Sequence, residues 1–179
     1  MQIAELKEIT PLLAAAIAAS ATLLAVAVTN YFNLKVSKVN IETQRKQKIK
    51  ELTLEKLEDL FFLFDKWKTH FSNIYLCYLR CHRGKLAFND VLDQVNELTL
   101  LAPGEAQKFK MIMEVYFPYL AKEYQLVETA RKRIVPFLSD PQEKKINVQE
   151  FESYQVAFEQ ACDVFKSKIS SLAQATLSE

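Results

Sequence analysis

The chain is poor in the residues that interrupt regular structure. Its 179 residues include only 2 glycines and 5 prolines. Strand-rich folds need many turns, and turns depend on glycine, proline, asparagine and aspartate. Because leucine, alanine, lysine and glutamate, which favour helices, are common instead, the composition predicts long helices and argues against a strand-rich fold.

Residues with specialised chemistry are also scarce. The 3 cysteines are Cys77, Cys81 and Cys162, and the 2 histidines are His70 and His82. An odd number of cysteines without a dense framework indicates reduced thiols in a cytosol-facing domain. The formal net charge of +1 gives no general attraction for nucleic acid, so we do not expect nucleic acid as a partner.

Recognisable catalytic motifs are missing as well. Only Gly84 and Gly104 are available, so no glycine-rich loop can cradle a phosphate. Both histidines fall in one predicted helix rather than in a loop-built pocket, and no pair of carboxylates stands out. We therefore expect no enzymatic activity, no catalytic residue, no bound cofactor and no metal site.

One long segment contains no charged residue. Residues 11–32, PLLAAAIAASATLLAVAVTNYF, would extend about 33 Å as a helix, enough for a hydrocarbon core of roughly 30 Å. Pro11 suits the first turn of a helix, and Tyr31 and Phe32 end the segment where aromatic rings can lie among lipid headgroups. The segment predicts a single transmembrane helix, preceded by a short extracytoplasmic N-terminus at residues 1–10.

The charges that follow this segment predict its orientation. Residues 33–50 carry six basic side chains and one acidic side chain, a net charge of +5; the basic ones are Lys35, Lys38, Arg45, Lys46, Lys48 and Lys50. Positive charge close to a span is retained in the cytoplasm. We expect a basic juxtamembrane helix at 33–50, a location in the cell membrane, the N-terminus outside, and residues 33–179 in the cytoplasm.

The same basic residues have two interpretations. They either only fix the topology of the span, or they also bind the anionic lipid surface of the bilayer. Lys46, Lys48 and Lys50 are the candidates for contact with that surface.

Two other interpretations of the apolar segment are open. Ala25-Val26-Ala27 resembles a small-x-small cleavage site after an apolar run, as in a cleaved export signal. Against this, Glu5 and Glu8 accompany Lys7, so the positive region that begins a signal peptide is missing. A soluble or interfacial helix is the second alternative.

Small residues within the span suggest two kinds of assembly. Ala14, Ala18 and Thr22 recur every fourth residue, a spacing that lets helices approach closely in lipid, and they are the candidate oligomerisation residues. A membrane-disrupting oligomer could instead line a pore with polar residues of the span: Ser20, Thr22, Thr29 and Asn30.

The rest of the chain carries amphipathic patterns. From residue 57, apolar residues recur three and four apart, as in a heptad seam: Leu57, Leu60, Phe64, Trp67, Phe71, Ile74, Tyr78 and Cys81. Gly84 is expected to end this helix. A helix is predicted at 88–101, with Asn89 as its cap and Val91, Leu92, Val95 and Leu98 facing inward. Further helices are predicted at 105–117, with Phe109, Ile112, Met113 and Tyr116 on one face, and along an apolar stripe from Leu120 to Leu138.

The last predicted helix starts at Asn147, which forms a capping pair with Glu150, and frays after Ala173. Between the third and fourth patterns, Pro118 either starts a new helix or kinks the existing one. The fold class is therefore all-α: an N-terminal single transmembrane helix continuing into a cytoplasmic bundle of four or five helices at residues 51–179.

Three clusters in the bundle have both a functional and a structural interpretation. His70, Cys77 and Cys81 lie near one helix face and could bind zinc or haem, but we expect core thiols and a half-buried histidine. Arg131-Lys132-Arg133 could bind phosphate groups, but we expect a solvated helix end. The segment from Tyr116 to Leu120 is either an aromatic docking surface or a kink in the chain.

These patterns lead to a functional expectation. We expect a single-pass membrane protein whose bundle acts as an interaction or oligomeric scaffold, with the lipid bilayer and a protein partner or a second copy of the chain as its partners. The alternatives are a pore-forming effector, in which the bundle controls assembly of the spans, and a metal- or haem-binding bundle.

Overall fold

The computed structural model describes the backbone of residues 2–178 and the side chains of residues 11–178. Within this part of the chain there are five α-helices, two short 3-10 helices and no strand, which confirms the all-helical fold class. The elements are α1 (Gln2–His82), α2 (Phe88–Glu97), α3 (Glu105–Tyr116), η1 (Pro118–Leu120), α4 (Ala121–Ile134), η2 (Val135–Phe137) and α5 (Val148–Ser178).

The chain divides into two compact units, one ending at Ile49 and the other beginning at Lys50. In the described residues the first unit contains only helix, the N-terminal part of α1. The second unit contains the rest of α1 and all the other elements, and it forms a helical bundle.

A single helix, α1, covers the three segments predicted as span, juxtamembrane helix and first bundle helix. It begins at Gln2, so Pro11 lies inside the helix, whereas the sequence predicted Pro11 in its first turn. Proline in a helix interior removes one backbone hydrogen bond. The good helix formers at 2–9, among them alanine, leucine and glutamate, favour continuation in spite of that loss.

The C-terminus of α1 confirms the predicted role of Gly84. This glycine has a φ of +68°, in the left-handed region that glycine adopts most easily. The amide of Gly84 donates to the carbonyl of Cys81 at 2.8 Å, and the amide of Lys85 donates to the carbonyl of Arg80 at 2.9 Å. This pair of bonds is a Schellman motif, which satisfies carbonyls that the helix end would leave unpaired.

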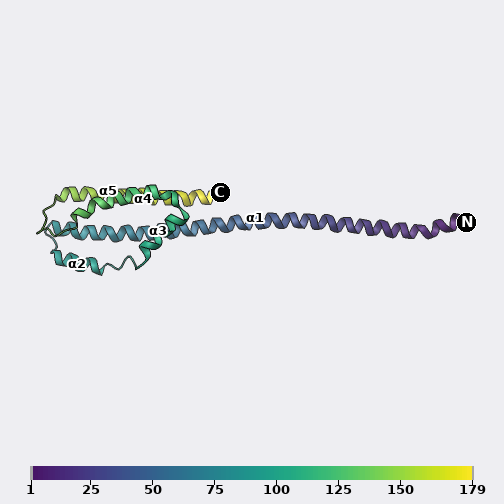
Figure 1. Ribbon diagram of the computed structural model, residues 1–179, viewed down its shortest axis with the longest axis horizontal. Coiled ribbons are helices and arrows are strands. Elements are labelled where there is room, and N and C mark those ends of the chain that lie inside the picture. The colour runs from purple at the N-terminus through teal and green to yellow at the C-terminus, as the bar shows by residue number, and fades with distance from the viewer. Residues whose placement is uncertain (1, 179) are drawn as a thin grey trace. The chain divides into compact units, whose positions relative to one another are not determined.

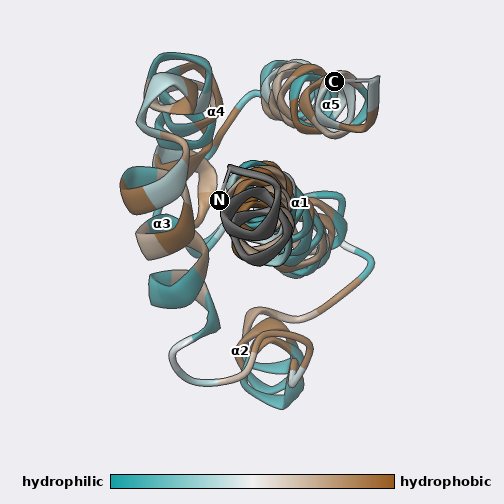
Figure 2. Ribbon diagram, turned by 90° about the vertical axis from the view of Figure 1, so that its right-hand side faces the viewer, coloured by the Kyte–Doolittle hydropathy of each residue, from teal (hydrophilic) through white to brown (hydrophobic). Residues whose placement is uncertain are grey.

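In the bundle, α2, α3, α4 and α5 are arranged around α1, with α4 and α5 next to each other (Figures 1 and 2). In the described part of the chain, no helix covers the side of α1 between α5 and α2 (Figure 2). Two large apolar side chains in the bundle part of α1 are exposed, Phe62 by 63% and Leu76 by 47%.

Two details of α2 differ from the sequence prediction. The helix ends at Glu97, so residues 98–101 are not helical, although they continue the apolar pattern. Its cap is Ala87 rather than Asn89, and Ala87 makes no side-chain cap bond. Val91 is fully buried as predicted, but Leu92 is 41% exposed, because a helix that packs on one neighbour alone buries only a narrow stripe.

The segment around Pro118 is a break between helices. Pro118 starts η1, and α4 follows directly, so of the two predicted alternatives the structure shows the one in which Pro118 starts a new helix. Phe117 and Leu120 are buried, whereas Tyr119 is 56% exposed. Tyr116, which was predicted to share the buried face of α3, is 43% exposed.

Asn147 caps α5 as predicted. Its side-chain oxygen accepts hydrogen bonds from the amides of Gln149, at 3.0 Å, and Glu150, at 3.3 Å. The carboxylate of Glu150 accepts from the hydroxyl of Tyr154 at 3.1 Å. The helix continues to Ser178, so the predicted fraying after Ala173 is not reflected in the fold.

The core of the bundle is rich in aromatic rings. The Phe64 ring, fully buried on α1, lies 5.7 Å from the ring of Trp67, 5.6 Å from Phe109 and 4.7 Å from Phe165, measured between centroids. Such ring pairs add about 0.5–1.5 kcal/mol each beyond the burial of their area. The predicted seam of α1 therefore faces the centre of the bundle and joins α1 to α3 and α5.

Candidate membrane span and bundle surfaces

The apolar segment of α1 is uncovered in the structure. Its large apolar side chains between Leu12 and Phe32 are 52% to 70% exposed. In the part of the chain that the structure describes, α1 is the one helix long and apolar enough to cross a membrane, near the N-terminus. A core helix of a soluble protein would have this composition only if it were buried, and this segment is not. A signal sequence meets the same length and composition criteria.

Three hydroxyl groups in this segment bond to their own helix. Ser20, Thr22 and Thr29 donate to the carbonyls of Ala16, Ala18 and Ala25, each at 2.8 Å. These bonds satisfy hydroxyl donors that hydrocarbon could not. They also occupy the donors that a pore lining would offer to water.

The candidate oligomerisation residues lie together on one face of α1. Ala14, Ala18 and Thr22 are spaced four apart, so successive side chains are offset by only about 40°. All three are exposed. The hydroxyl of Thr22 bonds to Ala18 along this same face, which leaves the surface small and internally satisfied.

The basic residues proposed to contact lipid divide into two kinds. Lys46 and Lys48 are exposed. Lys50 is half-buried, and its Nζ donates to the carbonyl of Leu177, in the last turn of α5, at 3.0 Å. A lysine there caps an unpaired carbonyl and faces the negative end of the helix dipole. Lys50 thus has a partner inside the bundle, which the sequence did not reveal.

The residues weighed as metal ligands are dispersed. In the described chain, no group of three or more histidines, cysteines and acidic residues is placed to hold a metal ion. Burial lowers the pKa of His70 and raises the pKa of the Cys81 thiol. The sulfur of Cys77 lies 3.6 Å from the side-chain oxygen of Gln94. The zinc or haem hypothesis therefore gains no ligand set from the structure.

The third cysteine is a core residue. Cys162 is fully buried on α5, and burial raises its pKa to about 12. A thiol in this environment stays protonated at neutral pH and packs as a small apolar side chain.

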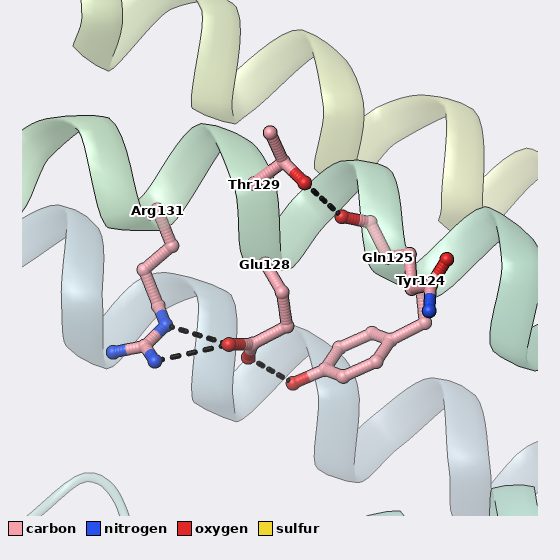
Figure 3. A network of polar contacts seen from close by, with 5 residues as sticks. All are labelled: Tyr124, Gln125, Glu128, Thr129 and Arg131. Atoms are coloured by element: carbon pink, nitrogen blue, oxygen red, sulfur yellow. Dashed lines mark hydrogen bonds and ion pairs between the residues drawn. The ribbon is translucent and has the colours of Figure 1, made fainter.

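A polar network on α4 was not identified from the sequence (Figure 3). The Tyr124 hydroxyl donates to the Glu128 carboxylate at 2.6 Å, and Arg131 Nη2 donates to the same carboxylate at 3.0 Å. The Arg131 guanidinium also lies over the Phe71 ring of α1, 5.5 Å from its centroid. Arg131 is therefore partly buried, and its prediction as part of a solvated helix end is wrong; Lys132 and Arg133 are exposed.

The electrostatics of this network favour a charged Glu128 and a neutral Tyr124. Burial by itself would raise the pKa of Glu128, but the hydrogen bonds from Tyr124 and Arg131 outweigh burial and lower the pKa. Burial raises the pKa of the Tyr124 hydroxyl, and its bond to Glu128 raises that pKa further. The spacing of a tyrosine, a glutamate four residues later and an arginine three after that is the signal by which the sequence could have indicated this network.

Ion pairs join α3 and α5 to α1. Lys66 pairs with Glu105 of α3 at 2.6 Å. Lys68 pairs with Asp163 of α5 at 2.6 Å, and Asp65 pairs with Lys166. These pairs flank the aromatic core and fix the register of α3 and α5 along α1.

The surface of the bundle is hollowed at helix junctions. A groove of about 320 Å³ between α1 and α5 is lined by Leu57, Glu58, Phe61, Ile169, Ser170 and Ala173. Between α1 and α2, a hollow of about 360 Å³ includes Leu76, Cys77 and Leu98. Neither hollow gathers a nucleophile, a base and an orienting group of the kind that an active site needs.

Comparison with protein-family models, with curated proteins and with solved structures finds no match to this chain. The protein is defined by its own architecture: an all-helical protein in which one helix carries an uncovered apolar segment near the N-terminus and also forms part of a bundle with an aromatic core.

Proposed function

We propose that this chain is a single-pass membrane protein whose helical bundle is a non-catalytic interaction module. The uncovered apolar side chains at 11–32 carry the proposal, because exposing them to water would be costly, whereas lipid accommodates them. The N-terminus lies outside the cell membrane and residues 33–179 lie in the cytoplasm, since the +5 charge of residues 33–50 follows the span directly.

Anchoring has a direct functional consequence. Confinement to two dimensions raises the effective concentration of the bundle toward other proteins in the same membrane. A bundle that binds weakly in solution can therefore bind productively at the membrane, as a scaffold for a protein partner or for further copies of itself.

Two measurements test anchoring and topology. Carbonate extraction of membranes should leave the protein in the pellet. A thiol introduced by Ser178→Cys should react with an impermeant reagent only after permeabilisation, whereas Lys7→Cys should react on intact cells. The unmodified chain measures the background from half-buried Cys77. Release by carbonate, or reaction of Ser178→Cys on intact cells, would refute this function.

Self-association is proposed to use the face of Ala14, Ala18 and Thr22. Ala18→Ile places a branched side chain on this face and should weaken association of the spans. Ala16→Ile, on the opposite side of the helix, is the matched control. Energy transfer between labelled copies in liposomes measures both, and equal transfer in the two variants contradicts this face.

A scaffold is preferred over a pore because of the three hydroxyl groups. Ser20, Thr22 and Thr29 already donate to their own helix, and Ser20 lies on the opposite side of the helix from Thr22 and Thr29, so the three do not form one polar side that could line a pore. Purified protein in planar bilayers should therefore carry no current at any protein density, and stepwise conductance would favour the pore instead.

A further inference from the structure

The groove between α1 and α5 has an apolar floor and one acidic edge. Leu57 and Ile169 are each only 1% exposed and form the floor, with Phe61 and Ala173 partly buried beside them. Glu58 stands at the α1 edge and is exposed. A floor made of well-packed side chains is already formed, so an occupant would not need to rearrange the core.

The groove extends along α5. A second hollow of about 480 Å³ shares Phe61 and Ser170 with the first and continues over α5 from Asp163 to Gln174, where the other lining residues are polar. That stretch of helix is about 16 Å long, or three turns. A short amphipathic helix lying along α5 fits both hollows, because its apolar residues would enter the first and its polar residues would face the second.

The charges at the groove are negative where they are uncompensated. The two nearby lysines are already paired: Lys68 with Asp163, and Lys166 with Asp65. Glu58 forms no ion pair with another described residue. One turn earlier on α1, the exposed Glu55 already pairs with Lys56 at 2.6 Å, so Glu58 is the unpaired acidic side chain among the described residues that line the groove. An occupant with positive side chains along the α1 edge would complement this surface, and an acidic one would be repelled.

We propose that the α1–α5 groove binds a basic amphipathic helix of a partner protein. Leucine-like side chains of that helix fill the space over Leu57, Ile169 and Ala173, and its lysines or arginines pair with Glu58. The inference rests on the proposed function, because membrane proteins with the same topology carry Lys- and Arg-rich segments next to their spans, in the same layer of cytoplasm. Anchoring of both proteins raises their effective concentration for this contact.

The test uses the full chain in nanodiscs of neutral lipid, so that lipid does not bind the probe electrostatically. The probes are two labelled amphipathic peptides of ~18 residues, a length at which a helix can form. Both carry leucines at i, i+3, i+4 and i+7, and they differ only in having lysine or glutamate on the flanks. Fluorescence anisotropy, corrected with empty nanodiscs, gives the two affinities.

We expect the lysine peptide to bind about threefold more tightly than the glutamate peptide, because the one exposed charge pair available, with Glu58, contributes only a small factor. Glu58→Lys should weaken the lysine peptide about threefold and strengthen the glutamate peptide. Glu114→Lys, an exposed glutamate of α3 away from the groove, makes the same change in net charge and should alter neither affinity.

A second pair of variants tests the groove itself. Ala173→Lys fills the groove and should weaken both peptides, whereas Ala175→Lys, exposed two residues later on α5, should weaken neither. Circular dichroism melting checks that each variant folds. If Ala173→Lys does not fold, Glu58→Lys still tests the groove, because Glu58 is exposed and its substitution should leave the fold intact.

Several results would overturn the inference. These are equal affinities for the two peptides, an equal response to Glu58→Lys and Glu114→Lys, or loss of self-association in Ala173→Lys with peptide binding unchanged. The last result would make the groove an interface between copies of the chain. Carbonate release of the protein, with groove-dependent binding intact, would refute the membrane function but support the groove.

Discussion

Residues 11–32 and residues 57–81 belong to the same helix, α1, yet they bury their side chains very differently. In the first segment Leu23 is 70% exposed. In the second, Leu60 and Phe64 are fully buried, and the apolar residues face the other helices of the bundle. Both segments form the same backbone hydrogen bonds, so helix formation does not distinguish them.

The difference lies in what surrounds each segment. A helix with a periodic apolar stripe needs a partner on one side only, and the bundle supplies it. A helix that is apolar on all sides needs an apolar environment on all sides, and no described part of the chain supplies one for residues 11–32. The same helical geometry is therefore stabilised by protein packing in one segment and, in our proposal, by lipid in the other.

Among the variants that test this comparison, removal of a core ring should cause the largest loss of stability. Phe64→Ala should lower the free energy of unfolding of the bundle by about 3–5 kcal/mol, since it removes a fully buried ring and leaves a cavity. Phe62→Ala, on the same helix and 63% exposed, is the matched control and should change it by under about 1 kcal/mol. Chemical denaturation of the full chain in nanodiscs measures both; equal losses would contradict the assignment of the core.

A charge in the apolar segment should have the next largest effect. Leu23→Arg should make insertion less favourable by about 2.5–3.5 kcal/mol, because the residue lies near the centre of the span. Leu126→Arg makes the same change at a leucine of α4 that is 61% exposed and should alter stability by only about 0.5 kcal/mol. The fraction retained after carbonate extraction reports insertion, and equal retention would show that the exposure of Leu23 has no relation to lipid.

The polar network of α4 gives a smaller, pH-dependent effect. Glu128→Gln weakens the bonds to Tyr124 and Arg131 and should lower stability by about 1–2 kcal/mol at neutral pH. Because folding lowers the pKa of Glu128, its contribution is complete above the pKa of the unfolded chain, about 4.3, and is lost as pH falls through the lower folded value.

Denaturation midpoints at neutral and acidic pH measure this dependence. The difference between the parent and Glu128→Gln should shrink on acidification. Glu114→Gln, at an exposed position on α3, should show no such change. A difference that stays constant with pH would mean that the Glu128 charge does not stabilise the bundle.

The smallest expected effect separates the two roles of Lys50. Lys50→Met removes the bond to the Leu177 carbonyl and should lower the stability of the bundle by about 0.5–1 kcal/mol, with faster amide exchange in the last turn of α5. Lys48→Met should leave that exchange unchanged but should weaken binding to anionic vesicles by about 1 kcal/mol if Lys48 contacts lipid. Identical amide exchange in the two variants would show that Lys50 does not cap the last turn of α5.

Several parts of the fold could be predicted because their signals are local. Gly84 ends α1 since its conformation is nearly specific to glycine, and Asn147 starts α5 since its side chain reaches the amides two and three residues on. The buried positions of α1 from Leu57 onward followed from periodicity, because that part of the helix packs against other helices of the bundle along its length. The predicted burial of Leu92 and Tyr116 was wrong, because periodicity shows which side of a helix is apolar but not how far a neighbouring helix covers that side.

The candidate sites also depend on contacts between helices that a local sequence pattern does not predict. Arg131 was predicted to be solvated because its neighbours are basic, yet the ring of Phe71, sixty residues earlier, covers it. The Lys50–Leu177 bond and the α1–α5 groove also join residues more than a hundred positions apart. No pattern within one helix encodes such pairs.

The sequence by itself determined the helical class, the uncharged apolar segment, the positive charge that follows it, the end of α1 at Gly84 and the start of α5 at Asn147, because composition, periodicity and turn chemistry act over a few residues. Only the tertiary structure decided which charges are paired, which apolar residues are left exposed and where a groove opens. Those properties depend on how closely helices far apart in sequence approach each other, and close packing fixes that distance side chain by side chain.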